Sequence, residues 1–86
     1  MNTFHLVVSS PDGKLFDGDA LMLTLRGVEG DLAIMSGHVP FVTSVVPCRC
    51  RITLPDDAIR EGDVSGGLLT VSDDCVTLLS GDFHWK

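Results

Sequence analysis

Short runs in which every second residue is apolar, each followed by a turn signal, constrain this chain more than any other feature. The clearest run covers residues 48–54, where cysteine, isoleucine and leucine alternate with two arginines and a threonine. A period of two is typical of a strand with one buried face, whereas an amphipathic helix repeats about every 3.6 residues. No stretch of the sequence shows the helical period. The sequence therefore predicts an all-β chain.

We expect about ten short strands separated by turns. Pro11-Asp12-Gly13 places proline and glycine where a β-turn favours them, and Asp17-Gly18-Asp19 is expected to end the second strand. Many short strands without a helix indicate a small β-sandwich or flattened barrel. The expected strands cover residues 3–8, 14–16, 21–26, 32–35, 41–46, 48–54, 58–63, 68–71, 75–80 and 83–85.

The apolar phases of these strands predict one hydrophobic core. With 86 residues, the chain is expected to form a single domain, residues 1–86, near the size at which one core is marginal. No internal repeat, linker or low-complexity segment divides it. The expected core residues are Phe4, Leu23, Leu25, Ile34, Ile52, Leu69, Val71, Val76 and Leu78.

The formal charge of −6, from twelve acidic and six basic side chains, limits the possible partners. Without a basic patch, the chain is not expected to bind nucleic acid or to adsorb to an anionic membrane. No apolar run is as long as a transmembrane helix, so direct membrane insertion is not expected either. No basic-then-apolar segment opens the chain as a signal peptide would.

The three cysteines are expected to be reduced and buried. An odd number without a Cys-x-x-Cys pair is typical of a reducing compartment. Cys48 and Cys50 share a strand face, but their Cα atoms would lie about 6.5–7 Å apart with parallel Cβ directions, which suits a disulfide poorly. We therefore interpret Cys48, Cys50 and Cys75 as small hydrophobic core residues.

The residue types that carry enzyme chemistry do not gather in a recognisable pattern. There is no phosphate-binding P-loop, and Gly66-Gly67 is better explained as a bend that enters a strand. His5, His38 and His84 are far apart in sequence and lack the spacing of metal ligands. The serines and histidines form no nucleophile–base arrangement. We expect no catalytic residue, no cofactor and no metal.

The segment 27–40 has the character of a recognition surface. Gly27 and Gly30 flank an acidic turn and allow the backbone to adopt positive φ angles there. A short alternating strand follows, and a second turn contains His38 and Pro40. We interpret these turns as a surface that recognises a partner, since neither a catalytic pair nor a set of metal ligands accompanies them.

This segment resembles the N-terminal β-sandwich domain of the epsilon subunit of F-type ATP synthases. That family carries Glu-Gly-acidic-Leu-small-Ile followed closely by Gly-His-Ala-Pro-Leu. The resemblance extends over nearly the whole chain, in the same order. The matching segments are Phe4-His5-Leu6-Val7-Val8-Ser9, Glu29-Gly30-Asp31-Leu32-Ala33-Ile34, Gly37-His38-Val39-Pro40-Phe41, Thr43, Pro47, Arg51-Ile52, Ser65-Gly66-Gly67-Leu68-Leu69 and Val76-Thr77-Leu78-Leu79.

The resemblance implies a non-catalytic subunit of the central stalk, which joins the gamma subunit to the membrane rotor ring during ATP synthesis driven by an ion gradient. It implies a peripheral position on the cytoplasmic face of a bacterial plasma membrane. The family's acidic loop faces basic and amide side chains of the rotor ring. By this resemblance, the ring-facing residues are Glu29, Asp31 and Met35, and the gamma-facing residues are His38, Pro40, Phe41 and Thr43.

Two departures from the family pattern affect these expectations. Met35-Ser36 stands where the family usually has an aromatic residue and proline. Family members usually continue into a two-helix hairpin that brakes ATP hydrolysis and, in some members, binds nucleotide. This sequence stops at Lys86, so the resemblance implies neither an inhibitory role nor a nucleotide site for these residues.

Two other classes of β-sandwich remain as alternatives. A lipoyl or biotinyl carrier would be modified at Lys14, which follows Pro11-Asp12-Gly13, but the Met-Lys or Asp-Lys-Ala setting of such carriers is absent. A generic adhesion module would be expected to carry a disulfide framework and a signal peptide, and the sequence has neither.

Overall fold

The computed structural model describes residues 2–37, 39–73 and 75–86, and these residues form strands and turns without a helix. Nothing in these ranges therefore offers a helix long and apolar enough to cross a membrane. The strands are β1 (Phe4–Ser10), β2 (Gly13–Ala20), β3 (Met22–Gly27), β4 (Gly30–Met35), β5 (Phe41–Val45), β6 (Cys48–Thr53), β7 (Ile59–Val64), β8 (Gly67–Val71), β9 (Cys75–Ser80) and β10 (Phe83–Trp85).

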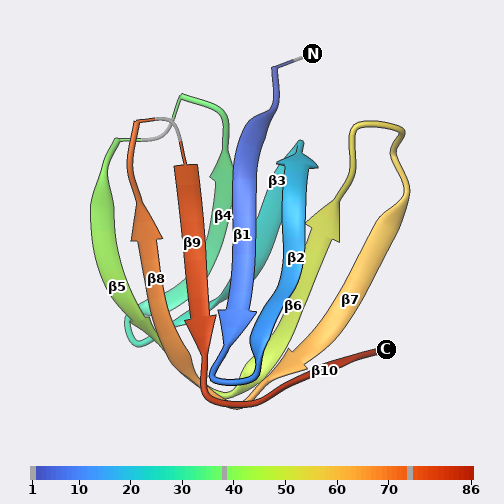
Figure 1. Ribbon diagram of the computed structural model, residues 1–86. Helices are drawn as coiled ribbons and strands as arrows, with labels where there is room; N and C mark the ends of the chain where they lie inside the picture. The colour runs from blue at the N-terminus through green and yellow to red at the C-terminus, as the bar shows by residue number, and fades with distance from the viewer. Residues whose placement is uncertain (1, 38, 74) are drawn as a thin grey trace.

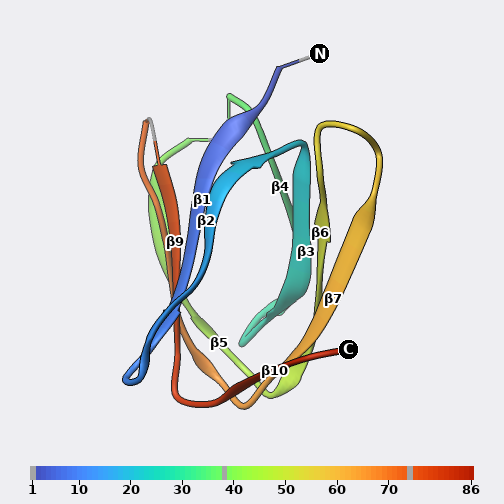
Figure 2. The same ribbon diagram turned by 45° about the vertical axis from the view of Figure 1, so that its right-hand side comes forward.

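The strands form two layers that face each other (Figures 1 and 2). The front sheet has the order β5-β8-β9-β1-β2, and the back sheet has the order β10-β7-β6-β3-β4. The two sheets are joined where β3 pairs with β5 through Gly27 and Val45. Neighbouring strands are antiparallel except β1 and β9, which run in parallel. The expected all-β sandwich is confirmed.

Aliphatic side chains from both sheets fill the space between the layers. Every expected core residue except Phe4 is buried, and Phe4 is half-buried and packs against the core. Alternation along each strand therefore identified the inward face correctly. The core also includes residues that were not expected there: Leu6, Val8, Ala20, Val45, Val64 and Phe83.

Strand β2 is longer than expected, and Asp17-Gly18-Asp19 does not end it. Instead, these three residues pair in register with Val7, Leu6 and His5 of β1. The two carboxylates point outward and lie 2.6 and 3.8 Å from the imidazole nitrogens of His5. Pairing with a neighbouring strand and contact with the imidazole of His5 thus override the local turn preference of aspartate and glycine.

The bend at Gly66-Gly67 does lead into a strand, as expected. Gly66 has a φ of +122°, which L side chains rarely adopt. Gly67 is limited by space instead, because a Cβ atom there would overlap the main-chain carbonyl of Leu79. The β8–β9 pairing starts at this point, so its first residue must be glycine.

We predict that Gly67→Ala destabilises the fold by about 1–3 kcal/mol, because the backbone of β8 or β9 must move to admit the methyl group. Gly18→Ala is the matched control, since its Cβ would lie 3.6 Å from the ring of Phe16, an ordinary contact. Urea unfolding followed by circular dichroism measures both. Equal stability of the two variants would show that the β8–β9 contact is looser than described.

The cysteines are free, but only one is fully buried. Cys50 lies in the core, and Cys48 is half-buried at the start of the same strand face. The expectation that Cys75 belongs to the core is wrong. Val76 and Leu78 occupy the inward phase of β9, so Cys75 lies on the outward face and is half-buried.

Burial raises the pKa of the Cys50 thiol from an ordinary value of 9.0 to about 11. The unfolded chain ionises Cys50 at the lower pKa, so the stability contribution is complete below pH 9 and is lost as the pH rises towards 11. We predict that ionisation of this group lowers the free energy of unfolding by up to about 3 kcal/mol across that window. The measurement is urea unfolding at several pH values, comparing the slope of the wild type with that of Cys50→Ala. Identical slopes would contradict the assignment.

Candidate functional site

The acidic turn expected from the sequence is the tip of the β3–β4 hairpin. Gly27 pairs with Gly30, so Val28 and Glu29 form the two-residue turn at the lower end of the sandwich in Figure 1. Gly30 has a φ of +131°, which explains why glycine follows the turn. Both turn residues are exposed, and 61% of the surface of Val28 is accessible.

This hairpin is fixed to the end of β5 by backbone hydrogen bonds. The amide of Val28 donates to the carbonyl of Ser44 over 3.1 Å, and the amide of Val46 donates to the carbonyl of Arg26 over 3.1 Å. Gly27 is buried between them, and a Cβ atom there would lie 3.1 Å from a methyl group of Leu32. The tip is therefore held at a defined position at the junction of the two sheets.

The hairpin carries one basic and two acidic side chains. Arg26 and Asp31 lie directly opposite each other, and the guanidinium Nε is 2.9 Å from the carboxylate Oδ1. The hydrogen bond to Asp31 raises the pKa of Arg26 above its ordinary value. Glu29 has no ion pair with any residue in the described part of the chain. Arg26 was not among the residues predicted from the sequence. In an antiparallel hairpin in which Gly27 pairs with Gly30, Arg26 must lie opposite Asp31.

Met35 does not join this cluster. It lies at the other end of β4, opposite Met22, and half of its surface is exposed. It is four positions along the strand from Asp31, which corresponds to about 13 Å. The three expected ring-facing residues therefore divide between the two ends of the sandwich.

Of the residues expected to face the gamma subunit, Pro40 lies in the β4–β5 connection, and Phe41 and Thr43 lie in β5, which begins at the upper end in Figure 1. Pro40 is exposed, and His38 lies outside the described residues. Phe41 and Thr43 are half-buried and occupy the inward phase of β5 with the buried Val45. The outward position between them is taken by Val42, which is 62% exposed and which the sequence analysis did not select.

The outer faces of the two sheets differ in charge. On the back sheet, Arg26, Arg49 and Arg51 each pair with an acid directly opposite on the neighbouring strand. On the front sheet, the outward positions of β5, β8 and β9 carry no charged side chain. These positions are Val42, Ser44, Leu68, Thr70, Cys75, Thr77 and Leu79.

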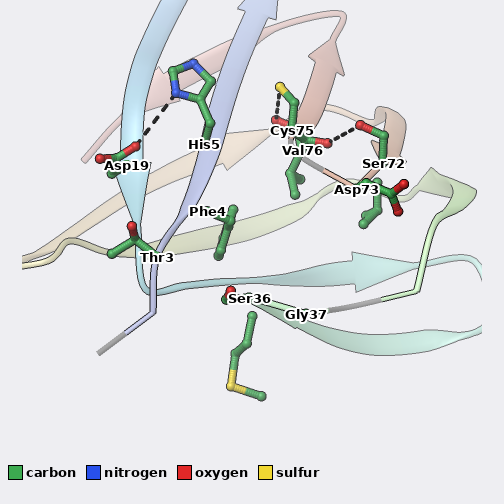
Figure 3. Close-up of a pocket in the computed structure, with 12 residues that line it drawn as sticks. Thr3, Phe4, His5, Asp19, Ser36, Gly37, Ser72, Asp73, Cys75 and Val76 are labelled. Atoms are coloured by element: carbon green, nitrogen blue, oxygen red, sulfur yellow. Dashed lines mark hydrogen bonds and ion pairs between the residues drawn. The ribbon is translucent and has the colours of Figure 1, made fainter.

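A hollow of about 180 Å³ opens at the upper end, between the start of β1, the end of β4 and the β8–β9 turn (Figure 3). Some of its polar side chains already have partners. His5 lies beside Asp17 and Asp19, and the hydroxyl of Ser72 donates to the carbonyl of Cys75 over 2.8 Å. Across the described ranges, no three His, Cys, Asp or Glu side chains gather in an arrangement that could hold a metal ion. The hollow therefore offers no evident ligand set.

Lys14, the candidate for covalent modification, lies within β2 rather than at a hairpin tip. Its ammonium group is 3.1 Å from the carboxylate of Asp17. The hydrogen bond from Lys14 lowers the pKa of Asp17. A lysine paired in this way along a strand does not present the extended, isolated side chain that a carrier domain needs.

A comparison with known protein families shows which family the chain belongs to. The family model for "ATP synthase, Delta/Epsilon chain, beta-sandwich domain" matches residues 3–86. The chain belongs to this family. The resemblance noted in the sequence is thereby confirmed, and it covers the acidic hairpin, the β4–β5 connection and the Gly66-Gly67 bend.

Curated relatives of this epsilon-type domain are longer than the chain. This chain is 39% identical over 80 residues to the ATP synthase epsilon chain of Delftia acidovorans. It is 40% identical over 80 residues to that of Polaromonas naphthalenivorans. Each match covers 93% of this chain and 58% of the relative. The chain therefore spans a little over half the length of these relatives.

Solved structures share the fold of this epsilon-type domain. A chain in the cryo-EM structure of the Euglena gracilis mitochondrial ATP synthase (OSCP/F1/c-ring, rotational state 1) matches with a TM-score of 0.91 and 19% identity, over 96% of this chain and 53% of that chain. A chain in the Tetrahymena thermophila central stalk and c-ring structure matches with a TM-score of 0.78 and 13% identity, over 95% and 66%. At these identities, the likeness shows the fold.

The ring of Phe41 points inward from β5 and contributes to the stability of the domain. Phe41→Ala should destabilise the domain by about 2 kcal/mol or more, because the ring packs against the core. Val42→Ala is the neighbouring control and should change stability by about 0.5 kcal/mol, because its side chain faces outward. Thermal unfolding compares the two variants. If Phe41→Ala unfolds like the wild type, the ring does not support the core and its role lies at the surface.

Proposed function

We propose that this epsilon-type domain is a non-catalytic part of the central stalk of an F-type ATP synthase, linking the gamma subunit to the membrane rotor ring. The observation that supports this most is the family match over residues 3–86, together with relatives named ATP synthase epsilon chain. Among the described residues, the arrangement of side chains suits recognition: a fixed charged tip at one end and an uncharged outer surface over β5, β8 and β9. The domain transmits rotation mechanically, and the chemistry takes place elsewhere in the complex.

The rotor ring contacts the tip of the β3–β4 hairpin in this proposal. Glu29 is exposed at the turn, and Asp31 is exposed on the adjoining strand. Backbone hydrogen bonds from the hairpin to β5 hold the tip in place. A force applied to the tip is therefore transmitted to both sheets. Met35 belongs to the opposite end of β4, and we therefore assign it to the surface around the β4–β5 connection.

The gamma subunit contacts the β4–β5 connection and the neighbouring front sheet in this proposal. Pro40 is exposed beside β5, and Val42, Leu68 and Leu79 are exposed apolar side chains on the uncharged outer surface of β5, β8 and β9. An uncharged face on a chain of net charge −6 is suited to a permanent partner, because its burial costs little desolvation. Phe41 and Thr43 support this surface from the inward side of β5. His38 stays part of the proposed gamma surface from sequence alone.

The proposed location follows from the relatives. Both named bacteria have an ATP synthase epsilon chain that matches this chain over 93% of its length. We propose a peripheral position on the cytoplasmic face of a bacterial plasma membrane, held through the gamma subunit and the ring. The net charge of −6 suits attachment through protein contacts, because an anionic lipid surface would repel it.

The test is removal of the charge at the hairpin tip in the double variant Glu29→Gln with Asp31→Asn. Exposed carboxylates contribute little to folding, so stability should change by less than about 1 kcal/mol. Binding to gamma should be unchanged, and attachment to membranes that hold the rotor ring should weaken and depend less on salt.

The control is Asp56→Asn with Asp57→Asn, which removes the same charge from the β6–β7 turn at the other end. Asparagine suits these positions, because Asp57 has a φ of 68° and the Asp56 side chain accepts a hydrogen bond from the amide of Ala58. This control should attach like the wild type. Equal attachment of both double variants at every salt concentration would sink the assignment of the hairpin to the ring.

A further inference from the structure

The β3–β4 hairpin contains an arginine whose role goes beyond packing. Arg26 lies one residue before the Gly27–Gly30 pair, on the same outer face as Asp31. Both side chains are largely exposed, at 61% and 79%, so their contact is not forced by burial. The main chain of Arg26 is fixed, because its carbonyl accepts the hydrogen bond from the amide of Val46. The guanidinium is therefore presented next to the turn from a rigid base.

The charges of the hairpin do not act as a simple acidic cluster. Arg26 contributes +1, and Glu29 and Asp31 contribute −1 each, so the hairpin has a net charge of −1. The separation of 2.9 Å between Arg26 and Asp31 makes these two charges a local pair, whereas Glu29 has no described cation partner. A cationic side chain that approaches the tip consequently experiences the field of Glu29, while the pair acts on it only as a dipole.

We propose that Arg26 is a positioning residue of the ring-facing surface, which neutralises Asp31 and leaves Glu29 as the single carboxylate offered to a cationic side chain of the partner. This inference rests on the proposed function and defines the chemistry of the same surface. The partner loop presents a lysine or arginine to the tip, with an apolar group beside it that meets the exposed Val28. Asp31 holds Arg26 away from Glu29, and Arg26 holds Asp31 away from the partner.

A double-mutant cycle separates this arrangement from direct contacts. The probe is binding of the gamma-bound protein to membranes stripped of their peripheral sector but retaining the rotor ring, at low and high salt. Arg26→Gln releases Asp31 and should bind about three- to fivefold more tightly at low salt. Asp31→Asn releases Arg26 and should bind weaker by a similar factor. The double variant Arg26→Gln with Asp31→Asn should bind within about twofold of the wild type, because only a neutral pair is lost.

Two further variants complete the experiment. Arg26→Lys retains the positive charge and should restore wild-type binding and its salt dependence. Glu29→Gln should weaken binding about three- to fivefold, and all these differences should shrink at high salt, where exposed charges are screened. Thermal unfolding confirms that every variant is folded, as expected for substitutions of exposed side chains.

The outcomes that overturn the inference differ from those that overturn the proposed function. Weaker binding of Arg26→Gln would show that the arginine contacts an acid of the partner directly. A double variant as weak as Asp31→Asn would show that Asp31 itself contacts the partner. In both cases Glu29→Gln still weakens binding, so the hairpin remains the ring-facing surface. If Glu29→Gln binds like the wild type, the hairpin does not meet the ring and both proposals fail.

Discussion

The structure depends on the junction between the last residues of β3 and the last residues of β5. The pairing there is one residue pair long, between Gly27 and Val45, and a backbone hydrogen bond lies on each side of it. Position 27 is tightly packed at this junction, because a Cβ atom there would lie 3.1 Å from a methyl group of Leu32 and 3.4 Å from the Thr43 hydroxyl and the Ser44 carbonyl. Through this junction the two sheets share a corner, and the β3–β4 hairpin projects from that corner as a rigid element.

Because the junction fixes the hairpin, the two proposed partner surfaces are related through the fold itself. The acidic tip lies at the lower end in Figure 1, while Pro40 and Met35 lie at the upper end. Strand β5 runs between these two ends, and its lower end forms backbone hydrogen bonds with the hairpin. A load applied at one end reaches the other along paired strands, which deform little. This geometry suits a part that transmits torque between two neighbours.

The strand interiors were predictable from the sequence because burial of one face imposes a period of two on each strand. Errors arose where tertiary contacts decide. Asp17-Gly18-Asp19 has the composition of a turn, but pairing with β1 and the contact with His5 keep it in β2. Cys75 is hydrophobic, but Val76 and Leu78 occupy the inward phase. The position of Glu29 at a turn followed from its flanking glycines, whereas the neutralisation of Asp31 by Arg26 requires the hairpin register.

The parallel pairing of β1 with β9 affects when the protein can fold during its synthesis on the ribosome. Leu6 and Val8 are fully buried, yet the strand beside them comprises Cys75–Ser80, near the end of the 86 residues. More than seventy residues must be synthesised before the first strand can pair with this neighbour. Contacts between such distant segments slow folding and leave apolar segments exposed in the meantime. The front sheet can therefore close only after β9 has left the ribosome.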